Sequence, residues 1–234
     1  MTQYYKIANL TVAMASFGRT ARQAEPYRLE TARRADIVIT SNWKALQESQ
    51  PHLSQDDCEY LSTGSSFYKQ LLMFDGMLLH ASAVVMDGYA YLFSAPCGTG
   101  KSTHTRLWTE NLKGAFLLND DKPALRWENG TLYAYGTPWS GKTGLNRNLR
   151  IPVVGICVLR RGAENQIDPC PLPEAIHALL EQTVRPRDPE GMQRLLTLLD
   201  RLIPTVRVWK MECNMDPAAA LMSYNAMSAG RKEE

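Results

Sequence analysis

The chain contains the segment Tyr91-Leu-Phe-Ser-Ala-Pro-Cys-Gly-Thr-Gly-Lys-Ser-Thr103, in which an apolar run leads into a glycine-rich turn and then into helix-forming residues. A buried strand before such a turn and a helix after it form the context that a phosphate-binding loop requires. The apolar run 88–94 predicts the strand, and the spacing of apolar residues after the turn predicts a helix over 102–112. We therefore expect a nucleotide-phosphate site here.

The turn itself is expected to hold the phosphates of ATP. Its backbone N–H groups would converge on phosphate oxygens, Lys101 would reach the outer phosphates, and the Ser102 hydroxyl would hold Mg²⁺. The residues expected to contact the nucleotide are Cys97, Gly98, Thr99, Gly100, Lys101, Ser102 and Thr103. The usual pattern begins with a further glycine, where this chain has Ala95. Alanine costs little there if its φ is negative.

Two consecutive carboxylates, Asp120 and Asp121, follow a short apolar strand predicted over 114–119. In phosphate-loop enzymes an acid at a strand tip orients Mg²⁺, and a second carboxylate nearby takes a proton from the attacking hydroxyl. Turn chemistry offers another interpretation, in which Asn-Asp-Asp-Lys is a polar turn that closes a hairpin with Pro123. The phosphate loop upstream favours the catalytic interpretation.

His80 stands ahead of a hairpin, Met86-Asp-Gly-Tyr89, that leads into the strand of the phosphate loop. A strand ending in histidine, a hairpin, this loop, a helix and an Asp-Asp pair together resemble the catalytic domain of HPr kinase/phosphorylase. The loop is also similar to that of ATP-dependent phosphoenolpyruvate carboxykinase. The motifs cover residues from about 80 to 121. The resemblance implies an α/β P-loop kinase core with a mixed sheet of the HPr kinase/phosphoenolpyruvate carboxykinase type, and ATP and Mg²⁺ as cofactors.

The same resemblance implies a role for each polar residue of these motifs. Lys101 would contact the β- and γ-phosphates, while Ser102 and Asp121 would hold Mg²⁺. Asp120 would act as the general base toward a substrate hydroxyl, and His80 would lie beside the phosphate or the base. A lone histidine near a strand end is as often a structural residue, so this alternative stays open for His80.

The chain also departs from the family pattern. Cys97 stands where HPr kinases carry Ser, and no Glu-Ile-Arg-Gly-type signature follows the two carboxylates. In its place is the glycine-rich, basic segment 136–152, which we expect to overhang the phosphates. Lys142 in that segment would neutralise charge on the transferred phosphoryl group, the alternative being a solvated connection with Trp139 packed beneath it. HPr itself is not the substrate that we expect.

Composition is typical of a compact enzyme. The 234 residues are 44% hydrophobic, and the net charge of +2 provides no strong field for nucleic acid or an anionic membrane. The five cysteines are scattered without a CxxC pair, which favours a reducing cytoplasm over a disulfide or zinc framework. We find no secretion signal and no run near the ~18 apolar residues of a membrane span. A cytoplasmic protein without nucleic-acid or membrane partners is expected.

We expect the chain to divide near residue 75 into an N-terminal α+β subdomain or cap, 1–75, and an HPr kinase-like P-loop catalytic domain, 76–234. In the first part, patterning predicts strands near 4–14, 27–30, 35–40 and 57–62 and helices near 42–48 and 66–73. Toward the C-terminus it predicts amphipathic helices over 173–183 and 188–202, a strand over 204–211, and a final helix that begins with Asp216 as its N-cap.

These features predict an ATP-dependent kinase that moves the γ-phosphoryl group to a hydroxyl, first of all to a Ser of a protein or peptide. The alternatives are a small-molecule kinase and a non-catalytic, nucleotide-sensing regulatory module. A base such as Asp120 favours the enzyme, because a sensor has no use for one. The expected partner is a protein or peptide with an acceptor Ser, and the resemblance also allows a homo-oligomer. Reversal by phosphate needs a second phosphate site, which the sequence does not locate.

Overall fold

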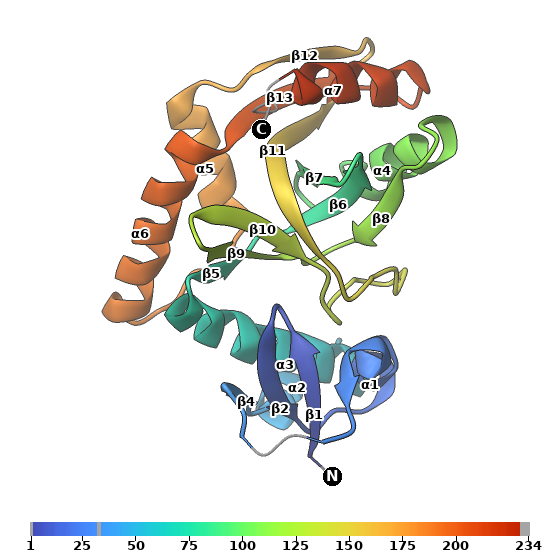
Figure 1. Cartoon of the computed structure of the whole chain (residues 1–234). Coiled ribbons are helices and arrows are strands. Elements are labelled where there is room, and N and C mark those ends of the chain that lie inside the picture. Colours follow the sequence, from blue (N-terminus) through green and yellow to red (C-terminus); the bar gives the residue numbers. More distant parts are fainter. Residues whose placement is uncertain (1, 32–33, 230–234) are drawn as a thin grey trace.

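The structure is a computed structural model that describes residues 2–31 and 34–229, with helices and strands arranged around two sheets (Figure 1). The smaller sheet has the order β3-β1-β2-β4. Its strands are β1 (Gln3–Ile7), β2 (Leu10–Met14), β3 (Arg28–Leu29) and β4 (Ile37–Ile39), and its helices are α1 (Gly18–Ala24), α2 (Trp43–Ser49) and α3 (Gln55–Leu71). The short 3-10 helices η1 (Glu25–Tyr27) and η2 (Leu72–Phe74) complete this N-terminal part.

The larger sheet has nine strands and is mixed. Its path runs β5-β9-β10-β11-β7-β6-β8, and β13 also pairs with β11 and with β12. The strands are β5 (Gly76–Leu78), β6 (Ala81–Met86), β7 (Tyr89–Ser94), β8 (Phe116–Asn119), β9 (Ala124–Glu128), β10 (Thr131–Tyr135), β11 (Arg150–Arg161), β12 (Gln166–Pro169) and β13 (Arg207–Cys213). β11 is parallel to β7 and β13, whereas β6 is antiparallel to both of its neighbours. The expected α/β class with a mixed sheet is confirmed at this level.

Helices cover both faces of the larger sheet, and alternate residues of β7 divide between the two cores. Tyr91 and Phe93 pack with α4 (Lys101–Asn111) and α7 (Ala218–Ser228), while Leu92 packs with α5 (Leu172–Glu181) and α6 (Pro189–Thr205). Because side chains of a strand point alternately to opposite faces, a strand buried on both sides reads as a continuous apolar run. The apolar run 88–94 is therefore explained by its central position.

Most of the predicted elements are present. The hairpin before the phosphate loop turns at Asp87-Gly88, whose φ values of 52° and 79° fit the two-residue turns that follow strand twist. α5, α6 and β13 lie where helices and a strand are predicted. The final helix begins at Ala218 with Pro217 at its N-cap, one residue after the predicted N-cap Asp216. The Ala218 N–H donates to the Asp216 carboxylate over 2.8 Å.

The predicted strand over 57–62 is wrong, because these residues lie in the first half of α3. Ser54 caps this helix by accepting a hydrogen bond from the Asp57 N–H over 3.1 Å, and two acidic residues occupy the first turn. This capping signal outweighs the strand propensity of Tyr60 and its neighbours. The pattern reading also missed α1, a short helix with few apolar residues.

The N-terminal part shares a hydrophobic core with the larger sheet. Phe67 of α3 stacks on Trp139 at 4.8 Å between ring centroids, and Trp139 is fully buried. The hydrophobic cluster around this pair contains buried residues of both parts of the chain, such as Tyr5 and Ala124. The boundary predicted at residue 75 lies between η2 and β5. The division into 1–75 and 76–234 stays a prediction.

Among the described residues, no helix has both the length and the apolar character needed to cross a membrane.

Replacing Trp139 by Ala should lower the free energy of unfolding by about 3–5 kcal/mol, the usual cost of removing a large buried aromatic side chain. The loss includes the stacking on Phe67 and the hydrogen bond from the indole N–H to Thr63 Oγ1, 3.2 Å long. Urea unfolding measures this change. Met215→Ala is the matched control, because Met215 is 76% exposed and should shift the value by less than about 0.5 kcal/mol. Similar decreases in the free energy of unfolding for Trp139→Ala and Met215→Ala would contradict a core shared by the two parts.

Candidate functional site

The glycine-rich turn after β7 is shaped by two glycines with positive φ. Gly98 has φ +78° and Gly100 has φ +128°, conformations that residues with a Cβ rarely adopt. A Cβ placed on either glycine would meet no protein atom within 4 Å, so this face of the loop is open. Ala95 is not among the described residues with positive φ, which agrees with the expectation that alanine is tolerated there. The loop ends at Lys101, the first residue of α4.

Lys101 and Arg161 contact the carbonyl groups of this loop. The buried Lys101 ammonium donates to the Ala95 carbonyl over 2.9 Å. Arg161, near the end of β11, donates to the carbonyls of Gly98 over 2.5 Å and Thr99 over 3.2 Å. Burial lowers the pKa of Lys101, and the nearby Asp121 raises it in part. Lys101 thus lies under the loop and within the electrostatic reach of the carboxylates.

The strand order brings the loop and the two carboxylates to one edge of the sheet. β6 lies between β7 and β8 and is antiparallel to both, so β7 and β8 end at the same edge. Neighbouring strands are about 4.8 Å apart, which places the ends of β7 and β8 about 10 Å from each other. The Ala81 N–H, at the start of β6, donates to the Asp121 carbonyl over 3.1 Å. The site is therefore assembled across the first residues of β6.

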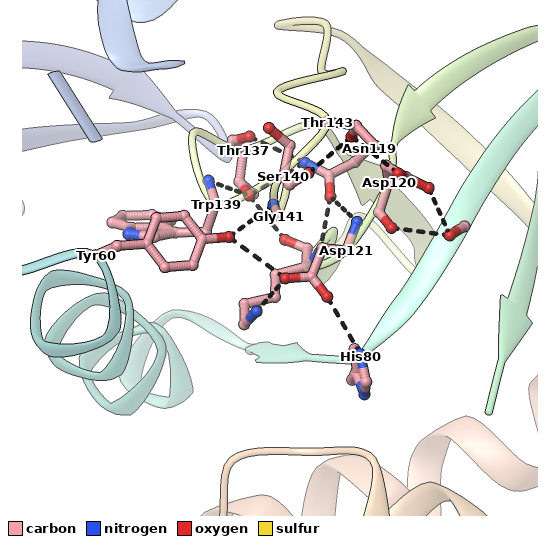
Figure 2. A network of polar contacts seen from close by, with 12 residues as sticks. Tyr60, His80, Asn119, Asp120, Asp121, Thr137, Trp139, Ser140, Gly141 and Thr143 are labelled. Atoms are coloured by element: carbon pink, nitrogen blue, oxygen red, sulfur yellow. Dashed lines mark hydrogen bonds and ion pairs between the residues drawn. The ribbon is translucent and has the colours of Figure 1, made fainter. Parts of the chain in front are cut away.

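Asp121 is the most strongly held carboxylate of the site. His80 Nε2 lies 3.2 Å from Asp121 Oδ1, the Lys122 ammonium pairs closely with Oδ2, and the Tyr60 hydroxyl lies 3.4 Å from Oδ2 (Figure 2). Burial raises the pKa of Asp121, but the His80 hydrogen bond and the Lys122 charge lower it more, to about 2. Asp121 is therefore an anion at neutral pH.

Asp120 lies among hydroxyl groups and is turned away from Asp121 (Figure 2). Its Oδ1 accepts a hydrogen bond from Ser82 over 2.9 Å, and its Oδ2 accepts one from Thr143 over 2.8 Å. The residue is buried, with 6% exposure. Since each carboxylate oxygen has two lone pairs, each keeps one for a further donor. The adjacent carboxylates thus have different surroundings, which suits two different roles.

His80 connects Asp121 to the segment after α5. Its Nδ1 lies 2.8 Å from Gln182 Oε1, and its backbone N–H donates to the Gln182 carbonyl over 2.7 Å. The Ser94 hydroxyl, at the end of β7, donates to the His80 carbonyl over 3.0 Å. His80 therefore contacts Asp121 and also links strands of the sheet. A structural role for His80 is the alternative that the sequence analysis left open.

The remaining predicted site residues differ in their exposure and in the elements that carry them. Cys97 is exposed on the loop, and Ser102 and Thr103 are the second and third residues of α4, with Ser102 exposed. Lys142 lies in the coil between β10 and β11 and is exposed, and it forms no ion pair with a described residue. A different lysine, Lys122, pairs with the Asp121 carboxylate.

Tyr60 is the main site residue that the sequence analysis missed. Its hydroxyl accepts a hydrogen bond from the Gly141 N–H over 2.8 Å and also reaches Asp121. The Arg19 guanidinium lies 4.0 Å from the centre of its ring. Reading residues 55–71 as a helix would have revealed the signal, since Tyr60, Gly64 and Phe67 then share the face that packs toward Trp139.

The residues at this edge of the larger sheet fit a nucleoside triphosphate. The open glycine face offers N–H groups at the start of α4, and Lys101 adds a positive charge. A hollow of about 350 Å³ adjoins the loop, lined by Thr99, Arg161 and Gln182 among others, and is large enough for a nucleoside. Ser102 and Asp121 are oxygen donors of the type that Mg²⁺ prefers. No group of three or more metal-binding side chains occurs in the described part of the chain.

Comparison with known proteins finds similarity among solved structures. No protein-family model matches the sequence, and no curated protein matches it. Among solved structures, a match is the HPr(Ser) kinase/phosphatase from Coxiella burnetii, which is 15% identical. The match covers 65% of this chain and 95% of that chain with a TM-score of 0.38. This score is too low to assign the chain to that family, so membership stays a prediction.

Lys122→Met should reduce the acid sensitivity of the protein. Asp121 ionises in the folded state with a pKa of about 2 against 3.8 ordinarily, so it stabilises the fold above pH 3.8 and loses this effect as pH falls through 2. Between pH 5 and 3 this group accounts for about 1 kcal/mol of lost stability. Without Lys122 the pKa of Asp121 rises and the loss shrinks.

Urea unfolding at pH 5 and pH 3 with EDTA present measures this difference. Lys113→Met is the matched control, because Lys113 is exposed and forms no ion pair with a described residue. If the free energy of unfolding fell by the same amount from pH 5 to pH 3 in Lys122→Met and in Lys113→Met, the pairing of Lys122 with Asp121 would be contradicted.

Proposed function

We propose that this protein is an ATP-dependent phosphotransferase that moves the γ-phosphoryl group to a hydroxyl, with a Ser of a protein or peptide as the acceptor. One observation carries the proposal: a glycine loop with open space beside Gly98 and Gly100 and two differently surrounded carboxylates lie at one edge of the sheet. The loop and Lys101 supply phosphate contacts. The carboxylates supply a metal ligand and a base.

In the proposed reaction the acceptor oxygen forms a bond to the γ-phosphorus, and the bond between that phosphorus and the bridging oxygen of ADP breaks. Asp120 takes the proton of the acceptor hydroxyl through a lone pair that Ser82 and Thr143 leave free. Lys101 leaves the Ala95 carbonyl for a phosphate oxygen, where its charge stabilises the transferred group. Mg²⁺, when bound through Ser102 and Asp121, neutralises phosphate charge and aligns the phosphates.

His80 and Lys122 have supporting roles in this proposal. Both contact Asp121, so they keep its carboxylate ionised and oriented toward the metal position. Lys142 lies in the loop that contains Thr143, and we propose that it adds positive charge near the incoming acceptor. Cys97 and Thr103 are proposed as nucleotide contacts through the loop and the first turn of α4.

Asp120→Asn should bind Mg²⁺-ATP with unchanged affinity but lose phosphoryl transfer by about 10²–10⁴-fold, because an amide cannot take a proton. The assay mixes the protein with Mg²⁺, γ-labelled ATP and size-fractionated cell extract and follows the label. Asp121→Asn is the matched comparison, and it should instead weaken the Mg²⁺-dependent part of ATP binding. Unchanged transfer by Asp120→Asn would rule out its role as the base.

The same assay separates the two alternatives. Label that enters only small molecules would identify a metabolite kinase, whereas tight ATP binding without any transfer would identify a nucleotide sensor. Label in a protein or peptide, absent with Asp120→Asn, supports the proposed acceptor.

Lys101→Met should weaken ATP binding by at least about tenfold, the effect expected when one charge-assisted phosphate contact is removed. Calorimetric titration with ATP and Mg²⁺ measures the affinity. Lys113→Met should bind like the unmodified protein, because Lys113 is exposed beyond the far end of α4. Equal affinities in all three proteins would show that the nucleotide does not use this loop.

A further inference from the structure

A second hollow is lined by α1 and by the coil 136–149. Its volume is about 390 Å³. α1 contributes Arg19, Arg22 and Gln23 to its lining, and the coil contributes Lys142, Thr143 and Asn146. We call this hollow the α1 cleft. The lining is polar, and all of its charged residues are basic.

The three cations of the α1 cleft differ in their carboxylate partners. Arg19 is held by Asp57 at 2.8 Å, and its backbone N–H donates to Asp56 over 2.7 Å. Arg22 and Lys142 are exposed and form no ion pair with a described residue. Asp57 pairs with Arg19 and also interacts with the charge of Lys142, whereas Arg22 has no carboxylate partner among the described residues.

Two buried polar atoms in the lining lack a partner in the described part of the chain, and one of them, an arginine N–H, is a donor that an anionic ligand could use. Arg19 Nε and Gln23 Oε1 are buried and have no hydrogen-bond partner among the described residues. Buried polar groups are nearly always paired, so each such atom in a native structure asks for an explanation. A ligand with a charged acceptor group would lie among Arg19, Arg22 and Lys142, and would pair with Arg19 Nε if the Arg19 side chain turned toward the cleft.

One residue, Thr143, connects the α1 cleft with the proposed base, Asp120. Thr143 lines the cleft, and its hydroxyl donates to Asp120 Oδ2 over 2.8 Å. The coil is also fixed to the N-terminal part, since Gln23 donates to the Gly141 carbonyl over 2.9 Å and Tyr27 donates to Asn146 over 2.9 Å. A ligand in the cleft and a hydroxyl at Asp120 would therefore both lie next to Thr143.

We infer that the α1 cleft binds a carboxylate side chain of the acceptor peptide, close in sequence to the hydroxyl that is phosphorylated. The inference rests on the proposed function and names its substrate class, an acidic peptide. Because Thr143 contacts both the cleft and Asp120, we expect the carboxylate close to the acceptor, and four extended residues would span about 13 Å at about 3.3 Å each. The N-terminal part thereby takes part in substrate selection.

The test uses short synthetic peptides with one central Ser that are identical except for one position, set to Asp, Asn or Lys within four residues of the Ser. Transfer from γ-labelled ATP gives KM and kcat for each peptide. The Asp peptide should have a KM about tenfold lower than the Asn peptide, the effect of one charge-assisted contact, with similar kcat. A readout independent of chemistry is fluorescence anisotropy with labelled peptides in which Ala replaces the Ser.

Arg22→Glu should abolish the preference for Asp and favour the Lys peptide, while its ATP affinity stays unchanged. Lys69→Glu is the matched control with the same change of charge, because Lys69 is exposed and lies about 18 Å further along α3 than Asp57. It should keep the preference for Asp. Arg22→Gln, a milder change, should also lose the preference and covers the case in which Arg22→Glu does not fold.

The outcomes separate this inference from the proposed function. Equal binding of the Asp and Asn peptides by the unmodified protein overturns the inference, and so does a preference for Asp that survives in Arg22→Glu and Arg22→Gln. Failure to phosphorylate any peptide counts against the proposed acceptor alone, because the anisotropy measurement still decides whether the cleft selects a carboxylate.

Discussion

The site depends on the antiparallel pairing of β6 with both β7 and β8. This pairing makes β7 and β8 end at one edge, about 10 Å apart, so that the glycine loop and the two carboxylates follow strand ends on either side of the start of β6. His80 belongs to the same arrangement, since it directly precedes β6 and contacts Asp121. A shift of β6 by one residue would move Ser82 to the opposite face and remove a hydrogen-bond donor from Asp120.

The N-terminal part completes the site because α3 packs against the coil that follows β10. Trp139 fixes the coil in the shared core, and Tyr60 connects its Gly141 N–H to Asp121. α1 then closes one side of the cleft beside Asp120. The same contacts that stabilise the fold therefore place Thr143 beside Asp120.

The sequence predicted the parts of the site that depend on local signals. The strand, glycine turn and helix of residues 88–112 follow from periodicity and turn chemistry, and Asp120 and Asp121 follow from their place at a strand end. Contacts between distant residues gave no such signal. Tyr60 is 61 residues from Asp121, Gln182 is 102 residues from His80, and the helix that carries Tyr60 was partly read as a strand. Which carboxylate is the base and which binds metal stays a prediction.

The most direct test of the account is a crystal structure with Mg²⁺ and a non-hydrolysable ATP analogue. The account predicts the β- and γ-phosphates on the N–H groups of residues 98–102, with Lys101 moved from the Ala95 carbonyl to a phosphate oxygen. It also predicts Mg²⁺ between Ser102 and Asp121, and the γ-phosphate within reach of an acceptor held at Asp120. A nucleotide bound elsewhere, with Lys101 still on Ala95 and the glycine loop empty, would contradict the central claim.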